Sequence, residues 1–223
     1  ENPFYHYAEA YKFKGKLEVK YLIKSFEIAA QRHHILRTKV VIENGQAFQK
    51  VNENLLVDVS EHDLWNLPQT EIEKVCQDLA INEARKSLES PDGYMTRLAI
   101  MRLKEDEFFV VLIMHHILGD NWSLHLLQQE VAGYYRKLAN GENVNFVPLK
   151  IQYADYAYWQ SLQKTNLENL VYWKNKMQDS LSLLQLPTDF PRPNRPTFRG
   201  AHSTQKFSGE LSNQLKIFCR EKN

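Results

Sequence analysis

The chain has 223 residues, of which 43% are hydrophobic, enough to bury a substantial core in one large domain. Its 28 basic and 27 acidic residues leave a net charge of +1, so no overall field directs it to nucleic acid or an anionic membrane. No apolar run approaches the ~20 residues of a membrane span, and the N-terminus lacks the regions of a signal peptide. We therefore expect neither nucleic acid nor membrane as a partner.

Cysteine usage bears on the compartment. Cys76 and Cys219 are the two cysteines, lie far apart in the sequence and do not show the close spacing typical of metal ligands. A disulfide framework is therefore not expected, and a reducing, cytoplasmic setting is the default.

The first part of the chain predicts a strand, a helix and a hairpin. Residues 4–15, FYHYAEAYKFKG, alternate aromatic and polar side chains with a period of two, which indicates a strand that ends at a glycine. Apolar residues at helical spacing predict a helix over 17–32. Residues 37–51 indicate a β-hairpin, because Asn44 and Gly45 tolerate the positive φ angles of a tight turn.

The middle of the chain predicts two helices and a second hairpin. A helix over 67–88 has a proline near its start. Residues 96–103 and 108–115 indicate two strands joined by the charged turn KEDE, and the second is apolar on both faces, as in the centre of a sheet. A further helix is predicted over 122–138.

The last part contains the clearest candidate boundary. Helices are predicted over 153–163 and 169–177, and the segment 189–200 then carries three prolines within six residues. Such a segment is typical of a stiff, extended connector. After it, 202–207 predicts a short strand and 208–222 a helix.

Strands that alternate with helices, including two hairpins, favour an α/β fold. We expect a two-layer α+β arrangement in which the helices pack on a mixed sheet.

The stretch MHHILGDNWS, residues 114–123, is the most unusual one. Consecutive side chains on a strand point to opposite faces, so one of His115 and His116 is expected to enter the core while the other faces a cavity. Gly119 permits a sharp bend, and Asp120 suits the N-cap of the following helix. An imidazole is thus placed at the C-terminal end of a central strand, where ligand sites of open α/β sheets concentrate.

An imidazole in this place can remove a proton from a nucleophile or donate a hydrogen bond to an oxyanion. Structural explanations stay open beside this one: His115 as a buried, hydrogen-bonded histidine, His116 likewise, and Asp120 as a cap or ion-pair partner. A metal site is not expected, because it needs three or four convergent ligands and adjacent strand histidines face apart. The sequence has no GxSxG pattern, so an acyl-enzyme is not indicated.

Four segments, in order, resemble the condensation domains of nonribosomal peptide synthetases. HHILGDN matches the HHxxxDG signature except at its last residue, and this signature recurs in the wider chloramphenicol-acetyltransferase-like superfamily. RHHILRT (32–38) resembles RHExLRT, and IQYADYAYWQ (151–160) resembles YxDYAxW. LPTDFPRPNRPTFRG (186–200) resembles the LPTDxPRP…xxFxG crossover region.

The resemblance implies a chloramphenicol-acetyltransferase-like fold, whose two similar halves form a V with the active site in a tunnel between them. Residues 1–188 then correspond to the N-terminal subdomain, and 189–223 to the crossover connector and the start of a truncated C-terminal subdomain.

The resemblance also implies the reaction, which belongs to the assembly of peptide natural products. A donor acyl or peptidyl thioester and an acceptor aminoacyl thioester join through an amide bond, and no cofactor binds directly because both substrates ride on the phosphopantetheine arms of carrier proteins. The implied partners are the upstream and downstream carrier proteins, a neighbouring adenylation domain and the missing C-terminal half. We expect the 223-residue chain alone to have no condensation activity, because that half forms part of the tunnel.

Carried over residue by residue, the resemblance makes His116 the side chain that faces the reacting groups. It takes the proton of the acceptor amine, or positions the amine and stabilises the tetrahedral intermediate. His115 and Asp120 are supporting residues, and the missing half supplies an arginine partner to Asp120.

The resemblance further implies that Asn121, Trp122 and Ser123 line the tunnel. Asn121 stands where the family has glycine; asparagine tolerates left-handed backbone conformations, but its side chain would narrow the tunnel. His34 replaces an acidic residue in a segment that we interpret as structural. Arg32 and Arg37 are available to carboxylates or to a carrier's acidic surface, and the structural interpretation is favoured.

Other members of the superfamily stay as alternatives. An epimerisation domain shares the HHxxxD core, although the Trp-Ser after Asn121 looks more like condensation, and a stand-alone acyltransferase would use a soluble thioester. A heterocyclisation domain is disfavoured because it replaces the histidine motif with aspartates. A non-catalytic member that docks carriers or recruits a partner enzyme typically loses the second histidine or the aspartate, and both are intact here.

Overall fold

The computed structural model describes residues 3–53, 57–88, 95–163, 166–178, 184–195, 197–198, 200–201 and 203–222. Internal contacts divide the chain into two units, Glu1–Asn175 and Lys176–Asn223. The first unit holds the sheet and its three packed helices. The domain boundary expected near residue 189 stays a prediction.

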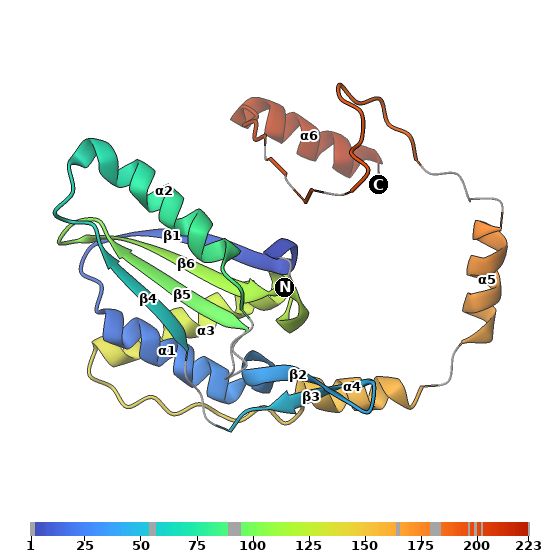
Figure 1. Ribbon diagram of the computed structural model, residues 1–223, viewed down its shortest axis with the longest axis horizontal. Helices are drawn as coiled ribbons and strands as arrows, with labels where there is room; N and C mark the ends of the chain where they lie inside the picture. Colours follow the sequence, from blue (N-terminus) through green and yellow to red (C-terminus); the bar gives the residue numbers. More distant parts are fainter. Residues whose placement is uncertain are drawn as a thin grey trace. The chain divides into compact units, whose positions relative to one another are not determined.

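A four-stranded mixed sheet forms the centre of the first unit (Figure 1), in the order β1 (His6–Lys14), β6 (Glu107–His115), β5 (Thr96–Arg102) and β4 (Asp58–Asp63). The β1/β6 and β6/β5 pairs are antiparallel, whereas β4 and β5 run parallel. β6 therefore lies inside the sheet, as its apolar character on both faces predicts.

The alternation of side chains along the sheet separates two cores. On one face α1 (Val19–Arg32) and α3 (Asn121–Ala139) cover the sheet, and on the other α2 (Gln69–Arg85) does so (Figure 1). The side chains that β6 buries towards α1 and α3 are Phe108, Val110, Leu112 and Met114; those on the α2 face are Val111 and Ile113. Each fully buried large apolar side chain contributes roughly 1.5–3 kcal/mol.

The hairpin predicted over 37–51 is confirmed. β2 (Thr38–Glu43) and β3 (Gln46–Val51) form a separate two-stranded sheet. Asn44 and Gly45 have φ angles of 51° and 78°, the left-handed values that a two-residue turn between twisted strands requires.

Three short 3₁₀ helices and three further α-helices complete the described structure. The 3₁₀ helices are Pro3–Tyr5, His34–Arg37 and His116–Leu118. The α-helices, all predicted from the sequence, are α4 (Tyr153–Ser161), α5 (Leu167–Met177) and α6 (Gly209–Lys222). No helix among the described residues has the length and apolar character needed to cross a membrane.

The sequence predictions differ from the structure at two strands. β4, with the sequence DVSEHD, was not predicted because its sequence lacks an apolar alternation. It forms because its backbone pairs with the edge of β5. The strand predicted over 202–207 is wrong for its described part, 203–207, which has no strand structure. A polar run becomes a strand only where another strand offers its backbone hydrogen bonds.

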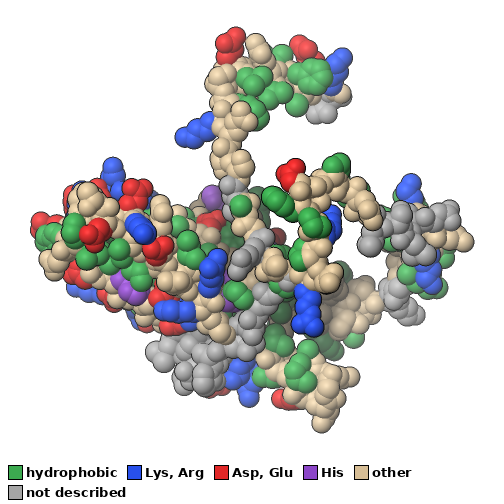
Figure 2. All heavy atoms as spheres, turned by 45° about the horizontal axis from the view of Figure 1, so that its top comes forward, with side chains coloured by type: hydrophobic (Ala, Val, Ile, Leu, Met, Phe, Trp, Pro, Cys, Tyr) green, Lys and Arg blue, Asp and Glu red, His purple; other side chains and the backbone are tan. Residues whose placement is uncertain are grey.

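The charged side chains show no separation by sign on the face drawn in Figure 2. Basic and acidic groups are interspersed there, in keeping with the net charge of +1.

Candidate functional site

His116 follows directly after β6 and begins the 3₁₀ helix His116–Leu118, so it lies at the C-terminal end of a central strand. Its side chain is exposed and lines a pocket of about 440 Å³ on the α1/α3 face. Within the described part of the chain the imidazole has no hydrogen bond or ion pair. Both ring nitrogens are therefore available to a ligand in the pocket.

His115 is half-buried and holds the turn that follows it. In the sheet register it pairs with His6 of β1. Its Nδ1 accepts a hydrogen bond from the Ile117 backbone N–H at 3.1 Å, so this nitrogen is the unprotonated one of the ring. Tyr5 stacks on the ring, with the centroids 6.2 Å apart. His115 thus caps the short helix that carries His116.

Asp120 is the N-cap of α3. Its Oδ1 accepts hydrogen bonds from the backbone N–H of Ser123 at 2.9 Å and from the Ser123 hydroxyl at 2.7 Å. These two bonds hold the pKa of the Asp120 carboxyl below its usual value, so the cap stays ionised and favours the positive end of the helix.

Gly119 joins the short helix to α3 in an extended conformation, with φ 170° and ψ 179°. A Cβ added to it would lie 2.8 Å from Cβ of Ser123. The glycine is therefore required by the close approach of the α3 start.

Asn121 is the first residue of α3 and does not adopt a left-handed conformation. The backbone tolerance that we considered for this asparagine is therefore not used, because the residue already belongs to a right-handed helix. Its Oδ1 instead accepts a hydrogen bond from the hydroxyl of Tyr7 at 3.0 Å. Ser123 lines the 440 Å³ pocket together with His116, whereas Asn121 and Trp122 do not, and the Trp122 side chain is 73% exposed.

The other wall of the pocket comes from the two flanking segments of the resemblance. His33, Ile35 and Leu36 belong to the RHHILRT segment, and Tyr153 belongs to the YADYAYW segment. The amide of Gln152 joins them: its Oε1 accepts from the His34 N–H at 3.1 Å, and its Nε2 donates to a backbone carbonyl at 3.0 Å. Segments that are about 80 and 35 residues from the histidine pair in sequence therefore meet it in space.

The charged groups of the RHHILRT segment bind within the chain. Arg32 forms an ion pair with Glu130 of α3, and His33 Nε2 lies 2.9 Å from the same carboxylate. Arg37 donates to the backbone carbonyl of Asn52. These contacts tie the end of α1 to α3 and agree with the structural interpretation of both arginines.

Sequence reasoning missed one side chain next to His116. The ring of Tyr7, on β1, packs edge-to-face against the imidazole, with centroids 5.9 Å apart and an interplanar angle of 87°. The alternating pattern of β1 predicts which face Tyr7 occupies, but only the β1/β6 register, which places Tyr7 opposite Met114, brings it to the histidine.

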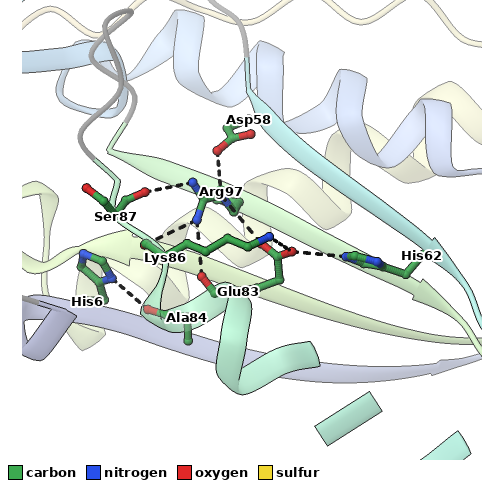
Figure 3. A network of polar contacts seen from close by, with 8 residues as sticks. All are labelled: His6, Asp58, His62, Glu83, Ala84, Lys86, Ser87 and Arg97. Carbon is green, nitrogen blue, oxygen red and sulfur yellow. Dashed lines mark hydrogen bonds and ion pairs between the residues drawn. The ribbon is translucent and has the colours of Figure 1, made fainter. Parts of the chain in front are cut away.

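A second polar cluster lies on the α2 face (Figure 3). Its centre is Glu83, whose side chain is 1% exposed. Oε1 of Glu83 lies 2.5 Å from Lys86 Nζ and 3.3 Å from His62 Nε2, while Arg97 reaches Asp58 at 2.6 Å and Oε2 of Glu83 at 4.0 Å. Every charge in this cluster has an opposite partner, so we interpret it as structural.

Among the described residues, no group of three or more His, Cys, Asp or Glu side chains is placed to hold a metal ion.

Comparison with known proteins decides the family. The condensation-domain profile matches residues 1–223. The chain belongs to the condensation-domain family. The resemblance to nonribosomal peptide synthetases stated from the four motifs is confirmed.

Curated relatives are much longer than this condensation-domain chain. A linear gramicidin synthase of Brevibacillus parabrevis is 34% identical over 99% of the chain, which spans 3% of that protein. Bacitracin synthase 2 of Bacillus licheniformis is 30% identical over 97% of the chain, which spans 8% of it.

Solved structures show the same fold. A complex of the X-domain and OxyB from teicoplanin biosynthesis matches with a TM-score of 0.74 and 24% identity, over 87% of this chain and 43% of the other. The starter condensation domain of rhizomide synthetase matches with a TM-score of 0.65 and 17% identity, over 80% of this chain and 43% of the other. The expected chloramphenicol-acetyltransferase-like arrangement of a mixed sheet with packed helices is thereby confirmed.

Proposed function

We propose that this chain is the N-terminal part of a condensation domain that forms an amide bond between two carrier-bound thioesters, with His116 as the residue that faces the reacting groups. The observation that carries the proposal is the exposed His116 imidazole, unpaired within the described structure and set in the wall of a 440 Å³ pocket. Membership of the condensation-domain family supplies the class of reaction.

The chemistry needs little more than orientation and one proton transfer. The nitrogen of the acceptor α-amine attacks the carbonyl carbon of the donor thioester, the N–C bond forms, and the C–S bond breaks. The α-ammonium, with a pKa of about 7.7–8.0, must lose a proton before it attacks, and a neutral imidazole can accept that proton. The leaving phosphopantetheine sulfur takes up a proton in turn. A thioester is already activated, so alignment of the two substrates supplies much of the rate.

The remaining site residues are proposed to support His116. His115 caps the short helix that carries it, and Asp120 caps α3 directly behind it. Ser123 borders the pocket, while Asn121 and Trp122 lie at the α3 start, where a tunnel completed by the second half of the domain would pass.

The proposed partners follow from the family. They are the carrier proteins that bring donor and acceptor, a neighbouring adenylation domain, and the second half of the condensation domain. The substrates arrive on phosphopantetheine arms, so no directly bound cofactor is proposed. The cytoplasm is the proposed compartment, in accord with free thiols at buried Cys76 and exposed Cys219.

We expect the 223-residue chain alone to form no amide product. This chain covers only 43% of each of the two solved chains with the same fold. A tunnel formed between the two halves of such a domain would be incomplete if only one half were present. Product formation from two loaded carriers by this chain alone would contradict this expectation.

The central test is His116→Ala in the full-length synthetase. The rate of amide formation from two loaded carriers should fall at least about 100-fold, the lower end for loss of a general base, while carrier binding persists. The matched control is His125→Ala, which removes another exposed histidine of the same region, hydrogen-bonded only to its helical neighbour Gln129 among the described residues. A His116→Ala enzyme that keeps its full rate would refute the catalytic role and leave a docking role.

A further inference from the structure

Three consecutive side chains, the last of the 3₁₀ helix Pro3–Tyr5 and the first two of β1, contact the rings of the histidine pair. Tyr5 and His6 lie against His115, with ring centroids 6.2 Å and 6.3 Å away. Tyr7 points to the other face of the sheet and packs edge-to-face on His116. β1 therefore contacts both histidines, each from its own side of the sheet.

The hydroxyl of Tyr7 reaches the helix that follows the histidine loop. It donates to Oδ1 of Asn121, the first residue of α3, at 3.0 Å. A second acceptor, Oε1 of Glu9, lies 3.3 Å away. One side chain thus touches the His116 ring and also holds the residue next to the Asp120 cap.

Glu9 anchors this arrangement further along the strand. Its Oε2 accepts from Gln128 Nε2 at 2.7 Å and also from the Tyr11 hydroxyl. Asn121 and Gln128 are seven residues apart and so lie on the same face of α3, two turns from one another. Both therefore bind β1, which fixes the first half of α3 against the strand.

The protonation state of Tyr7 suits a donor. Burial, the charge of Glu9 and its hydrogen bond raise the pKa of the Tyr7 phenol above its usual value. The hydroxyl therefore stays protonated throughout the physiological pH range, and its bond to Asn121 does not titrate there.

We propose that Tyr7 is a positioning residue for His116, acting through ring contact with the imidazole and through its hydrogen bond to Asn121. The inference rests on the proposed function of His116. Asn121 supplies the acceptor of this bond; a glycine, as in the HHxxxDG signature that the segment resembles, would have no side chain to accept it.

The geometry limits His116 in two ways. The Tyr7 ring restricts rotation of the imidazole on one side, and the hydrogen bond fixes the distance between β1 and the end of the loop that begins at His116. Because reaction rates fall about 100-fold for a misplacement near 1 Å, a loose imidazole would lower kcat and leave carrier binding intact.

The test compares four variants in the full-length synthetase. Tyr7→Phe and Asn121→Ala each remove the hydrogen bond, and each should lower kcat roughly threefold to tenfold, the loss typical of one hydrogen bond. The double variant should be no slower than the slower single variant, since both remove the same bond. Tyr7→Leu also removes the ring contact and should lower kcat further. It should also displace the pH at which kcat is half-maximal, and KM for both carriers should stay unchanged throughout.

The matched control is Tyr135→Phe. The Tyr135 hydroxyl accepts from the Glu18 backbone N–H at 3.0 Å and so also secures α3, but far along the helix from His116. This variant should keep both kcat and the pH profile. Equal losses in Tyr135→Phe and Tyr7→Phe would overturn the inference, because any loosening of α3 would then suffice.

Other outcomes separate the two proposals. If His116→Ala is inactive while Tyr7→Phe and Tyr7→Leu keep the wild-type kcat and pH profile, the positioning role is refuted and the role of His116 stands. Multiplying losses in Tyr7→Phe and Asn121→Ala would also refute it. If His116→Ala keeps its activity, the proposed function itself fails. Should Tyr7→Leu not fold, the Tyr7→Phe and Asn121→Ala pair decides.

Discussion

The sheet carries a polar cluster on each face, and the two clusters use their histidines differently. On the α2 face, His62 faces the buried Glu83 carboxylate, which is also bound by Lys86 and approached by Arg97. On the α1/α3 face, His116 is exposed beside a pocket, and its close neighbour is the ring of Tyr7.

The difference separates polar groups that stabilise the fold from a histidine left accessible, as its proposed catalytic role requires. A buried carboxylate tolerates burial only when cations and hydrogen bonds compensate it, and the α2 cluster supplies the cations Lys86 and Arg97 together with a hydrogen bond to His62. A residue that must exchange a proton with a substrate needs the opposite arrangement, with its nitrogen atoms left available. The groups proposed to support His116 are accordingly bonded to backbone and helix ends, whereas His116 itself has no hydrogen bond or ion pair among the described residues.

Removal of Glu83 should have the largest effect on stability. Glu83→Ala leaves Arg97 and Lys86 without their buried partner and should lower the free energy of unfolding by about 3 kcal/mol. Urea unfolding of the complete condensation domain measures it. Glu73→Ala is the control, because Glu73 lies exposed on the same helix. If the two variants lose the same stability, the α2 cluster is not a structural one.

Crowding the histidine loop should have the next largest effect. Gly119→Ala places a Cβ 2.8 Å from that of Ser123 and should cost about 1–3 kcal/mol of stability, typical of overpacking. Because the shift displaces His116, amide formation should slow as well. Gly133→Ala adds a methyl group to α3 where the space is open, and should stabilise the domain by up to about 1 kcal/mol. A thermal melt and a product assay distinguish the two; equal behaviour would contradict the tight approach at Gly119.

Acid should weaken the α2 cluster. Burial would raise the pKa of the Glu83 carboxyl, but the hydrogen bond and charge of Lys86, the His62 hydrogen bond and the charge of Arg97 outweigh it and lower this pKa. The folded state therefore binds the proton less tightly than the unfolded chain, whose glutamates titrate near about 4.3. The stabilisation is complete above that value and is lost as the pH falls towards the folded pKa.

The measurement for this pH effect is the free energy of unfolding between pH 6 and pH 3, in wild type and in Glu83→Gln. The variant starts less stable and should decline less steeply below about pH 4.5, since it lacks the titrating group. Parallel curves would show that Glu83 does not contribute to the acid sensitivity.

The smallest effect should come from the exposed member of the α2 cluster. The Lys86 side chain is 56% exposed, against 12% for Arg97. Lys86→Met should therefore cost less than about 1 kcal/mol, as for a solvent-screened pair, and Arg97→Met should cost more. If Lys86→Met and Arg97→Met lower the free energy of unfolding in urea by the same amount, the exposure of each cation to solvent does not decide how much it stabilises the Glu83 carboxylate.

Much of the fold could be predicted because the signals are local. Period-two and period-3.6 apolar patterns predicted β1, β5, β6 and the helices, and the Asn44-Gly45 pair predicted the hairpin turn. β4 escaped prediction because its sequence DVSEHD carries no apolar alternation, and the strand expected after the proline-rich segment is absent from residues 203–207.

The sequence by itself determined the family, the reactive histidine candidate and the cap at Asp120, since each depends on neighbouring residues in one short segment. Tertiary structure alone decided that the flanking motifs meet at the pocket, that Gly119 is required by Ser123, and that Tyr7 lies on His116 and bonds Asn121. These contacts depend on strand register and helix packing, which join residues up to 120 positions apart, and no local pattern encodes such distances.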